Sequence, residues 1–158
     1  MILGYLRNMC EVCTMNEPRF IEIEDLKPGY LDHINSLLSQ LSTSSHTITE
    51  ADLNSLISSS QSHLYALEYD EKFIGMVTLC IYQSPTGRKA WIEDVVVDQN
   101  YRGKGYGKVM IEKVIEQCIN RGNVTQMLTS RPSRVAANQL YKSLGFETRE
   151  TNVYKMSF

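Results

Sequence analysis

The stretch from Val95 to Lys108 constrains the fold of this chain more than any other. It begins with three valines, which are typical of a buried strand, and continues into a loop that contains Gly103, Gly105 and Gly107. Beyond Lys108, apolar residues recur at the three- and four-residue spacing of an amphipathic helix. The sequence therefore predicts a strand, a glycine loop and a helix in immediate succession.

The glycine loop has the features of a site for phosphate. Glycines let the main chain adopt dihedral angles that are closed to other residues, and they let a ligand approach the backbone. The amides at the start of the following helix point outward, with the positive end of the helix dipole behind them. Arg102, Lys104 and Lys108 add positive charge to a chain whose formal net charge is -2. We interpret the loop as a phosphate cradle; a tight turn that needs glycine only for its shape is the alternative.

Two common phosphate-binding patterns do not fit this loop. A Walker A motif needs glycine where Arg102 stands and Ser or Thr where Val109 stands, so a nucleoside triphosphatase is disfavoured. A dinucleotide fingerprint needs glycine at Lys108. The pattern that does fit is R-x-x-G-x-G, at Arg102, Gly105 and Gly107.

In this setting the loop resembles the pyrophosphate loop of the GNAT superfamily of N-acetyltransferases, which binds acetyl-coenzyme A. The segment 138–146 is similar to the later family motif N-x-x-[A/L]-Y-x-x-x-G-F. The resemblance is strong over about residues 63–158, weak over 19–61 and absent before that. It implies a GNAT-like fold, acetyl-CoA as cosubstrate and an amine as acceptor.

The resemblance also implies roles for single residues. In the family, the tyrosine at the position of Tyr141 lies near the thioester sulfur and acts as general acid, and the asparagine at Asn138 contacts the pantetheine arm. The main chain of Val95 and Val97 would hydrogen-bond the pantetheine like an added strand. The predicted coenzyme-binding residues are Val95, Val96, Val97, Arg102, Gly103, Lys104, Gly105, Tyr106, Gly107, Lys108, Asn138 and Tyr141. Tyr141 also lies on an apolar helical stripe, so a role in the core is the alternative.

Acyl transfer to an amine needs a base as well, because an amine with a lysine-like pKa of about 10 is protonated near neutral pH. Glu93 and Asp94 are the candidates, and their adjacency on a strand predicts that they face opposite sides. Two acids in a central strand are costly unless at least one faces a polar cavity. The resemblance favours Glu93, since a glutamate there acts as base, directly or through water, in a number of relatives. We predict that Glu93 and Tyr141 are catalytic residues. The alternatives are that Asp94 is the base, or that Glu93 only forms a salt bridge at the edge of the strand.

The amine acceptor is left open by the sequence. The prediction is direct acetyl transfer to a primary amine of a small molecule. Protein or peptide amines, glucosamine-6-phosphate and a non-catalytic acyl-CoA sensor are the alternatives. Enzymes that acetylate glucosamine-6-phosphate carry a similar I-E-D-V-V-V…Y-R-G-K-G-x-G run, but the acidic stretch expected there is replaced by residues 129–134. The basic segment 131–134 could contact an acidic acceptor or the 3′-phosphate of the coenzyme, or be a solvated helix start.

Length and composition predict one α/β domain in a cytoplasmic protein. The chain has 158 residues, of which 42% are hydrophobic and 22% charged, as in ordinary globular proteins. The pattern order β-α-α-β-β-β-α-β-α-β predicts a mixed α/β (α+β) domain over 18–158, with about six to seven strands and about four helices. Its last strand is expected over 153–158, and a helix is expected to begin at a capping box, Thr47 to Glu50. Residues 1–17 are predicted to be an extension of uncertain order.

The isoelectric point, the apolar runs and the cysteines limit the kinds of partner and metal that are expected. A pI near 5.9 disfavours a nucleic-acid binder, and no apolar run approaches the roughly 18 residues of a membrane span. The start of the chain lacks the features of a signal peptide. Cys10 and Cys13 form half of a zinc site with no second pair, while Cys80 and Cys118 lie in apolar segments, so no metal is predicted. A homodimer is compatible with the sequence.

Overall fold

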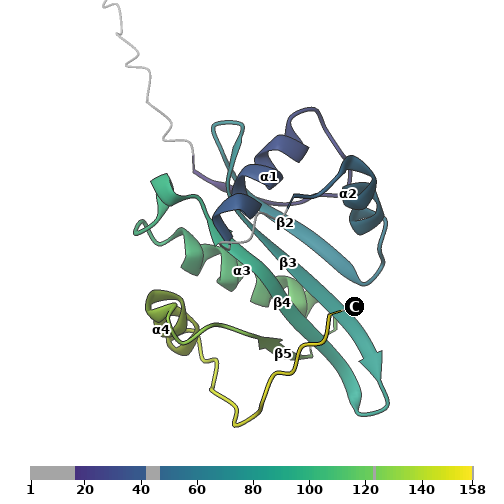
Figure 1. Cartoon of the computed structure of the whole chain (residues 1–158), viewed down its shortest axis with the longest axis vertical. Coiled ribbons are helices and arrows are strands. Elements are labelled where there is room, and N and C mark those ends of the chain that lie inside the picture. The colour runs from purple at the N-terminus through teal and green to yellow at the C-terminus, as the bar shows by residue number, and fades with distance from the viewer. Residues whose placement is uncertain (1–16, 42–46, 123, 158) are drawn as a thin grey trace, which may run out of the picture.

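The structure is a computed structural model that describes residues 17–41, 47–122 and 124–157. Its centre is a five-stranded sheet of order β1-β2-β3-β4-β5 (Figure 1). The first four strands pair antiparallel, and β5 pairs parallel to β4. The strands are β1 (Arg19–Glu22), β2 (Ser62–Tyr69), β3 (Lys72–Ser84), β4 (Gly87–Val97) and β5 (Thr125–Leu128).

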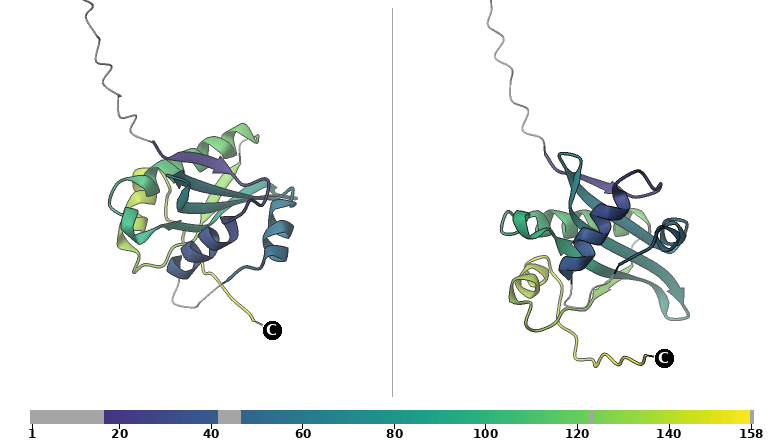
Figure 2. Two further views of the ribbon diagram at one scale, coloured as in Figure 1. Left: turned by 90° about the horizontal axis from the view of Figure 1, so that it is seen from above. Right: turned by 45° about the horizontal axis from the view of Figure 1, so that its top comes forward.

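Helices cover both faces of the sheet. One face carries α1 (Tyr30–Leu41) and α2 (Glu50–Ile57), and the other carries α3 (Tyr106–Asn120), as the edge-on view in Figure 2 shows. The fourth helix, α4 (Val135–Ser143), lies beside α3 near β5, and a short 3-10 turn, η1 (Gln99–Tyr101), follows β4.

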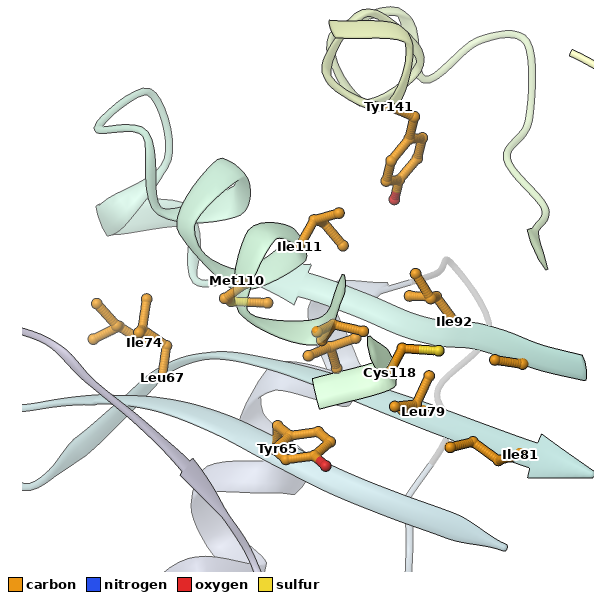
Figure 3. Close-up of a cluster of buried hydrophobic side chains, with 13 residues drawn as sticks. Tyr65, Leu67, Ile74, Leu79, Ile81, Ile92, Met110, Ile111, Cys118 and Tyr141 are labelled. Atoms are coloured by element: carbon orange, nitrogen blue, oxygen red, sulfur yellow. The ribbon is translucent and has the colours of Figure 1, made fainter. Parts of the chain in front are cut away.

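Each face has its own hydrophobic core because β3 is apolar on both sides. Residues 73–79 of β3 are all buried. The core under α3 contains Met110, Ile111 and Val114 at 0% exposure, together with Tyr141 from α4 (Figure 3). The core under α1 and α2 contains Leu37 and Leu53. Continuous apolar runs of this kind are expected of a central strand covered on both faces.

A β-bulge in β4 changes which residues face which core. Thr78 of β3 pairs with Glu93 and Met76 pairs with Val96, so two residues of β4 stand opposite one of β3. Before the bulge Ile92 faces the α3 core, whereas after it Val96 faces the core of α1 and α2. The alternation of side chains between the two faces of the sheet is thus shifted by one residue at Asp94, which has a φ of +52°.

The structure confirms the mixed α/β fold with four helices and corrects two details. The prediction of six to seven strands is too high, since the described residues form five. Over 153–157 the segment expected as a last strand forms no ladder with any described strand, and Val153, Tyr154 and Met156 are 76%, 88% and 77% exposed. An alternating pattern becomes a strand only where a ladder partner is available. Position 158 and nearly all of the predicted extension, with Cys10 and Cys13, lie outside the described residues.

A further correction concerns the start of α2. The N-cap is Thr49, whose hydroxyl accepts a hydrogen bond from the Asp52 amide at 3.2 Å. The Asp52 carboxylate accepts in return from the Thr49 amide at 3.3 Å. The capping box predicted at Thr47 and Glu50 is therefore wrong by two residues. The sequence contains two overlapping patterns in which an acidic residue follows a threonine by three positions, and the second of them forms the reciprocal hydrogen bonds of the capping box. None of the helices described is long and apolar enough to cross a membrane.

Candidate active site

The site begins where β4 and β5 part. The parallel pairing with β5 extends only from Lys89 to Ile92 of β4, and beyond Ile92 no described strand covers that edge. The bulge at Asp94 follows immediately. The main-chain polar groups of successive strand residues point to opposite edges. Since the Asp98 amide donates to Ile74 of β3 at 2.9 Å, the N–H and C=O of Val97 point away from β3, into the opening.

The glycine loop closes one end of this opening. Gly103 and Gly105 have φ values of +76° and +84°, and Gly105 is the N-cap of α3. No other residue type adopts these dihedrals at so little cost, so both glycines are needed for the path of the chain. Gly107 differs from them, because it has no positive φ and a Cβ there would make only van der Waals contact with Leu140 of α4, at 3.4 Å. The loop therefore directs the first amides of α3 outward and keeps their approach open.

Side chains from distant parts of the sequence hold the loop in place. Arg102 Nε donates to the Val97 carbonyl at 2.9 Å. Gln40 of α1 donates to the Asp98 carboxylate at 2.9 Å and accepts from the Gln99 amide at 2.8 Å. The hydrogen bond from Gln40, ahead of those from Asn100, lowers the pKa of Asp98. The end of α1 thus anchors the start of the loop.

A groove of about 700 Å³ runs from the glycine loop along the open edge of β4 to α4. Nearly all of the predicted coenzyme-binding residues line it: Val95, Val96, Val97, Arg102, Gly103, Gly105, Tyr106, Gly107, Lys108 and Tyr141. The structure brings these residues together from β4, the loop, α3 and α4. Two predicted residues lie outside the lining. Lys104 Nζ lies 5.0 Å from the centre of the Tyr101 ring, and the Asn138 amide donates to the carbonyls of Arg131 and Arg134.

Tyr141 lies at the far end of this groove. Its ring reaches from α4 toward Ile92 and Ile111, as Figure 3 shows, and 9% of the residue is exposed. Among the residues that the structure describes, none forms a hydrogen bond with its hydroxyl. Burial raises the pKa of Tyr141, and the positive charge of Arg134 opposes that shift. The hydroxyl is therefore protonated at neutral pH and available as a proton donor.

Glu93 and Asp94 line a second cavity, of about 410 Å³, which adjoins the groove. Both cavities are lined by Leu41, Val95, Arg134 and Tyr141, so they adjoin along a shared wall. The bulge interrupts the regular alternation on which the prediction of opposite sides for Glu93 and Asp94 depends, and both residues line this cavity. Burial, and then the negative charge of Asp94, raises the pKa of Glu93. A raised pKa makes Glu93 a stronger base.

Sequence reasoning missed a contact in the wall that the two cavities share. Arg134, at the N-cap of α4, donates from Nη2 to the Leu41 carbonyl at the end of α1 at 2.6 Å. This contact joins segments 93 residues apart. Arg134 did carry a signal in the sequence, because it belongs to the basic segment 131–134. Leu41 carried none beyond its place on an apolar helical stripe, since its role depends on tertiary packing.

The comparison with family models agrees with this geometry. The model of the Acetyltransferase (GNAT) family matches residues 31–146, which is most of the chain. The chain belongs to the GNAT acetyltransferase family. The matched range includes β4, the glycine loop, α3 and α4, which are the elements that form the groove.

Curated relatives with similar sequences act on chemically different amines. The mouse protein named thialysine N-epsilon-acetyltransferase is 40% identical over 65 residues, which are 41% of this chain and 38% of that protein. The Salmonella typhimurium [ribosomal protein bS18]-alanine N-acetyltransferase is 38% identical over 58 residues, 37% of this chain and 39% of that protein. The chain thus matches about two fifths of the length of these relatives.

Solved GNAT structures extend the likeness to nearly the whole chain. An acetyltransferase from Trypanosoma brucei has a TM-score of 0.73 and 22% identity, covering 89% of this chain and 100% of that one. The ribosomal-protein-alanine N-acetyltransferase of Brucella melitensis has a TM-score of 0.72 and 17% identity, covering 90% and 99%. At these identities the likeness shows the shared fold.

No metal site is found in the described part of the chain, where no three His, Cys, Asp or Glu residues are close enough to hold an ion.

Proposed function

We propose that this protein is an acetyl-CoA-dependent N-acetyltransferase that acetylates a primary amine of a small molecule by direct transfer. The observation that carries this proposal is the parting of β4 from β5 beside a glycine loop, with Tyr141 between the groove and the second cavity. Membership of the GNAT family supports the reaction class.

The groove suits an extended coenzyme with a diphosphate at one end. The outward amides at Gly105 and the start of α3, with Arg102 and Lys108 beside them, suit two negatively charged phosphates. The Val97 N–H at the open edge of β4 suits an amide of the pantetheine arm, which would add to the sheet like a short strand. Because the Val97 carbonyl already accepts from Arg102, we assign only the N–H of this residue to the coenzyme.

Two side chains are assigned to the proton transfers. Glu93 takes a proton from the acceptor ammonium, directly or through a water, so that the amine lone pair can form a bond to the thioester carbonyl carbon. Main-chain N–H groups at the bulge beside Val95 stabilise the oxyanion, because a bulge leaves such groups outside the regular ladder. The carbon–sulfur bond then breaks, and Tyr141 gives its hydroxyl proton to the departing thiolate. The second proton of the attacking nitrogen returns to the tyrosinate, directly or through water, which leaves a neutral amide and a neutral Tyr141.

The walls shared by the two cavities support direct transfer. The groove and the cavity of Glu93 meet at Val95 and Tyr141, so the thioester and the amine can approach each other without a covalent enzyme intermediate. Neither cavity is lined by a cysteine. Among the described residues, Cys118 is buried under α3 and Cys80 lies on β3, so neither is placed to accept an acetyl group.

The test is thiol release from acetyl-CoA across a panel of primary amines, with mass spectrometry of the acetylated product. We expect at least one small amine to accelerate release. A non-catalytic acyl-CoA sensor, the alternative from another class, would bind the coenzyme while no amine accelerates release. Peptide amines belong in the same panel, since the bS18-alanine relative is named for acting on a protein.

A further inference from the structure

We propose that the acceptor of this enzyme carries an anionic group as well as its amine, and that Arg131 binds that group. The inference rests on the proposed function, because it assigns the cavity beside Glu93 to the acceptor. It adds the chemical class of the acceptor: a small zwitterionic amine with a carboxylate or a phosphate.

Residues of both charges line this cavity. Glu93 comes from β4, whereas Arg131 and Arg134 follow β5. None of the ion pairs formed between described residues includes either arginine. A ligand with only positive charge would be attracted by Glu93 and repelled by the two arginines. A ligand with both charges can interact favourably with Glu93 and with an arginine at once.

Arg131 is better placed for the acceptor than for the coenzyme. It lines the cavity of Glu93 and does not line the groove, whereas Arg134 lines both and already donates to Leu41. The groove has cations of its own at the glycine loop, where Arg102 and Lys108 lie. The planar guanidinium of Arg131 can donate two parallel hydrogen bonds to a carboxylate or a phosphate.

The size of the cavity agrees with a small acceptor. About 410 Å³ is within the usual range for small-molecule sites, which is roughly 300–1,000 Å³. The amine end must lie toward Glu93 and Tyr141, where the reaction occurs. The anionic end then lies toward the segment between β5 and α4, which is where Arg131 stands.

The experiment compares matched amines that differ in the anionic group. The pairs are 4-aminobutyrate with butylamine, lysine with cadaverine, and phosphoethanolamine with ethanolamine, each with acetyl-CoA and the wild-type enzyme. We expect kcat/KM to be at least about tenfold higher for the anionic member of one or more pairs. The first two pairs report on carboxylate and the third on phosphate. Equal rates within every pair, a preference for the uncharged or dicationic members, or acetylation of peptides alone would overturn the proposal.

Variants then assign the preference to its residue. Arg131→Ala should raise KM for the preferred anionic amine about 10- to 100-fold, with kcat and the KM for acetyl-CoA within about twofold. Arg131→Glu should reverse the preference within the lysine–cadaverine pair. Arg19→Ala is the matched control, because Arg19 lies on β1 at the other edge of the sheet and pairs with Glu68. An anionic preference that survives both Arg131 variants, or a raised KM for acetyl-CoA instead, would overturn the assignment.

Binding measurements keep this test separate from that of the transferase activity. If no amine accelerates thiol release, the proposed function fails. Calorimetry of the same pairs against the enzyme saturated with coenzyme A then still decides the acceptor class. Tighter binding of the anionic members, lost in Arg131→Ala, would support the charge assignment, and equal binding would overturn it.

Discussion

The groove beside the glycine loop and the cavity of Glu93 share four residues but are built in different ways. The groove comes mainly from one continuous stretch, 95–108, with α4 added. The cavity of Glu93 combines the end of α1, the bulge of β4, the segment after β5 and Val153 near the end of the chain. The groove therefore depends on local backbone geometry, whereas the cavity depends on how distant segments pack. Changes in the groove should abolish binding, and changes in the cavity should tune rate and selectivity.

The largest effect is expected from Gly105→Val. Gly105 has a φ of +84° at the start of α3, where a β-branched residue is strained and its side chain would cover the outward amides. We expect calorimetry to show that the affinity for coenzyme A falls at least about 100-fold, because the variant loses about two charge-assisted hydrogen bonds to the diphosphate.

Gly29→Val is the matched control for that variant. Gly29 has nearly the same φ, +85°, with open space around it, and it lies at the opposite end of α1 from the groove. Its replacement should strain the backbone as much while leaving coenzyme affinity unchanged. The same loss of affinity in both variants would mean that general destabilisation, and not the amide cradle, is the cause.

The next largest effect is expected from Tyr141→Phe. The substitution removes the proton donor and keeps the ring in the core under α3. We expect kcat to fall about 100- to 1,000-fold while the Kd for coenzyme A stays within about twofold. Tyr82→Phe, on β3 at a distance from both cavities, is the control and should leave kcat unchanged. Equal losses of binding and of turnover would instead assign Tyr141 a packing role.

A smaller effect on rate, with a distinct pH signature, is expected from Glu93→Gln. A base works only when deprotonated, so activity falls as the pH drops below the pKa of Glu93, which burial and the charge of Asp94 raise. We expect the rate at neutral pH to fall about 100-fold and the acidic limb of the kcat/KM profile to flatten. Glu116→Gln, on the exposed face of α3, should leave the profile unchanged. An acidic limb that persists in Glu93→Gln would place the base elsewhere.

The smallest effect is expected from Asp94→Asn. Asparagine tolerates the positive φ of this position, so the bulge should be retained. Removing the negative charge removes one cause of the raised pKa of Glu93, and that pKa should fall. The acidic limb of the pH profile should therefore move to lower pH with little change in the maximal rate. A limb that stays in place or moves to higher pH would contradict the coupling between the two carboxyl groups.

The contrast between local backbone geometry and the packing of distant segments also explains which features could be predicted from the sequence. The order of elements and the glycine loop follow from apolar spacing and glycine positions, which are local signals. The bulge at Asp94 has no such signal, because the run of three consecutive valines beside it fits an unbroken strand equally well. The contact of Arg134 with Leu41 and that of Gln40 with Asp98 depend on where α1 ends relative to the sheet. The unpaired segment 153–157 has the pattern of a strand but no partner in the structure.

The central claim is that the glycine loop binds a diphosphate through main-chain amides. Calorimetric titration of the wild-type protein with coenzyme A, beside pantetheine, which has the same arm without the diphosphate, tests it most directly. We predict saturable one-to-one binding of coenzyme A with a Kd of about 1 μM, near −8 kcal/mol, and binding of pantetheine at least about 100-fold weaker. No heat with coenzyme A, or equal affinity for the two compounds, would contradict the claim.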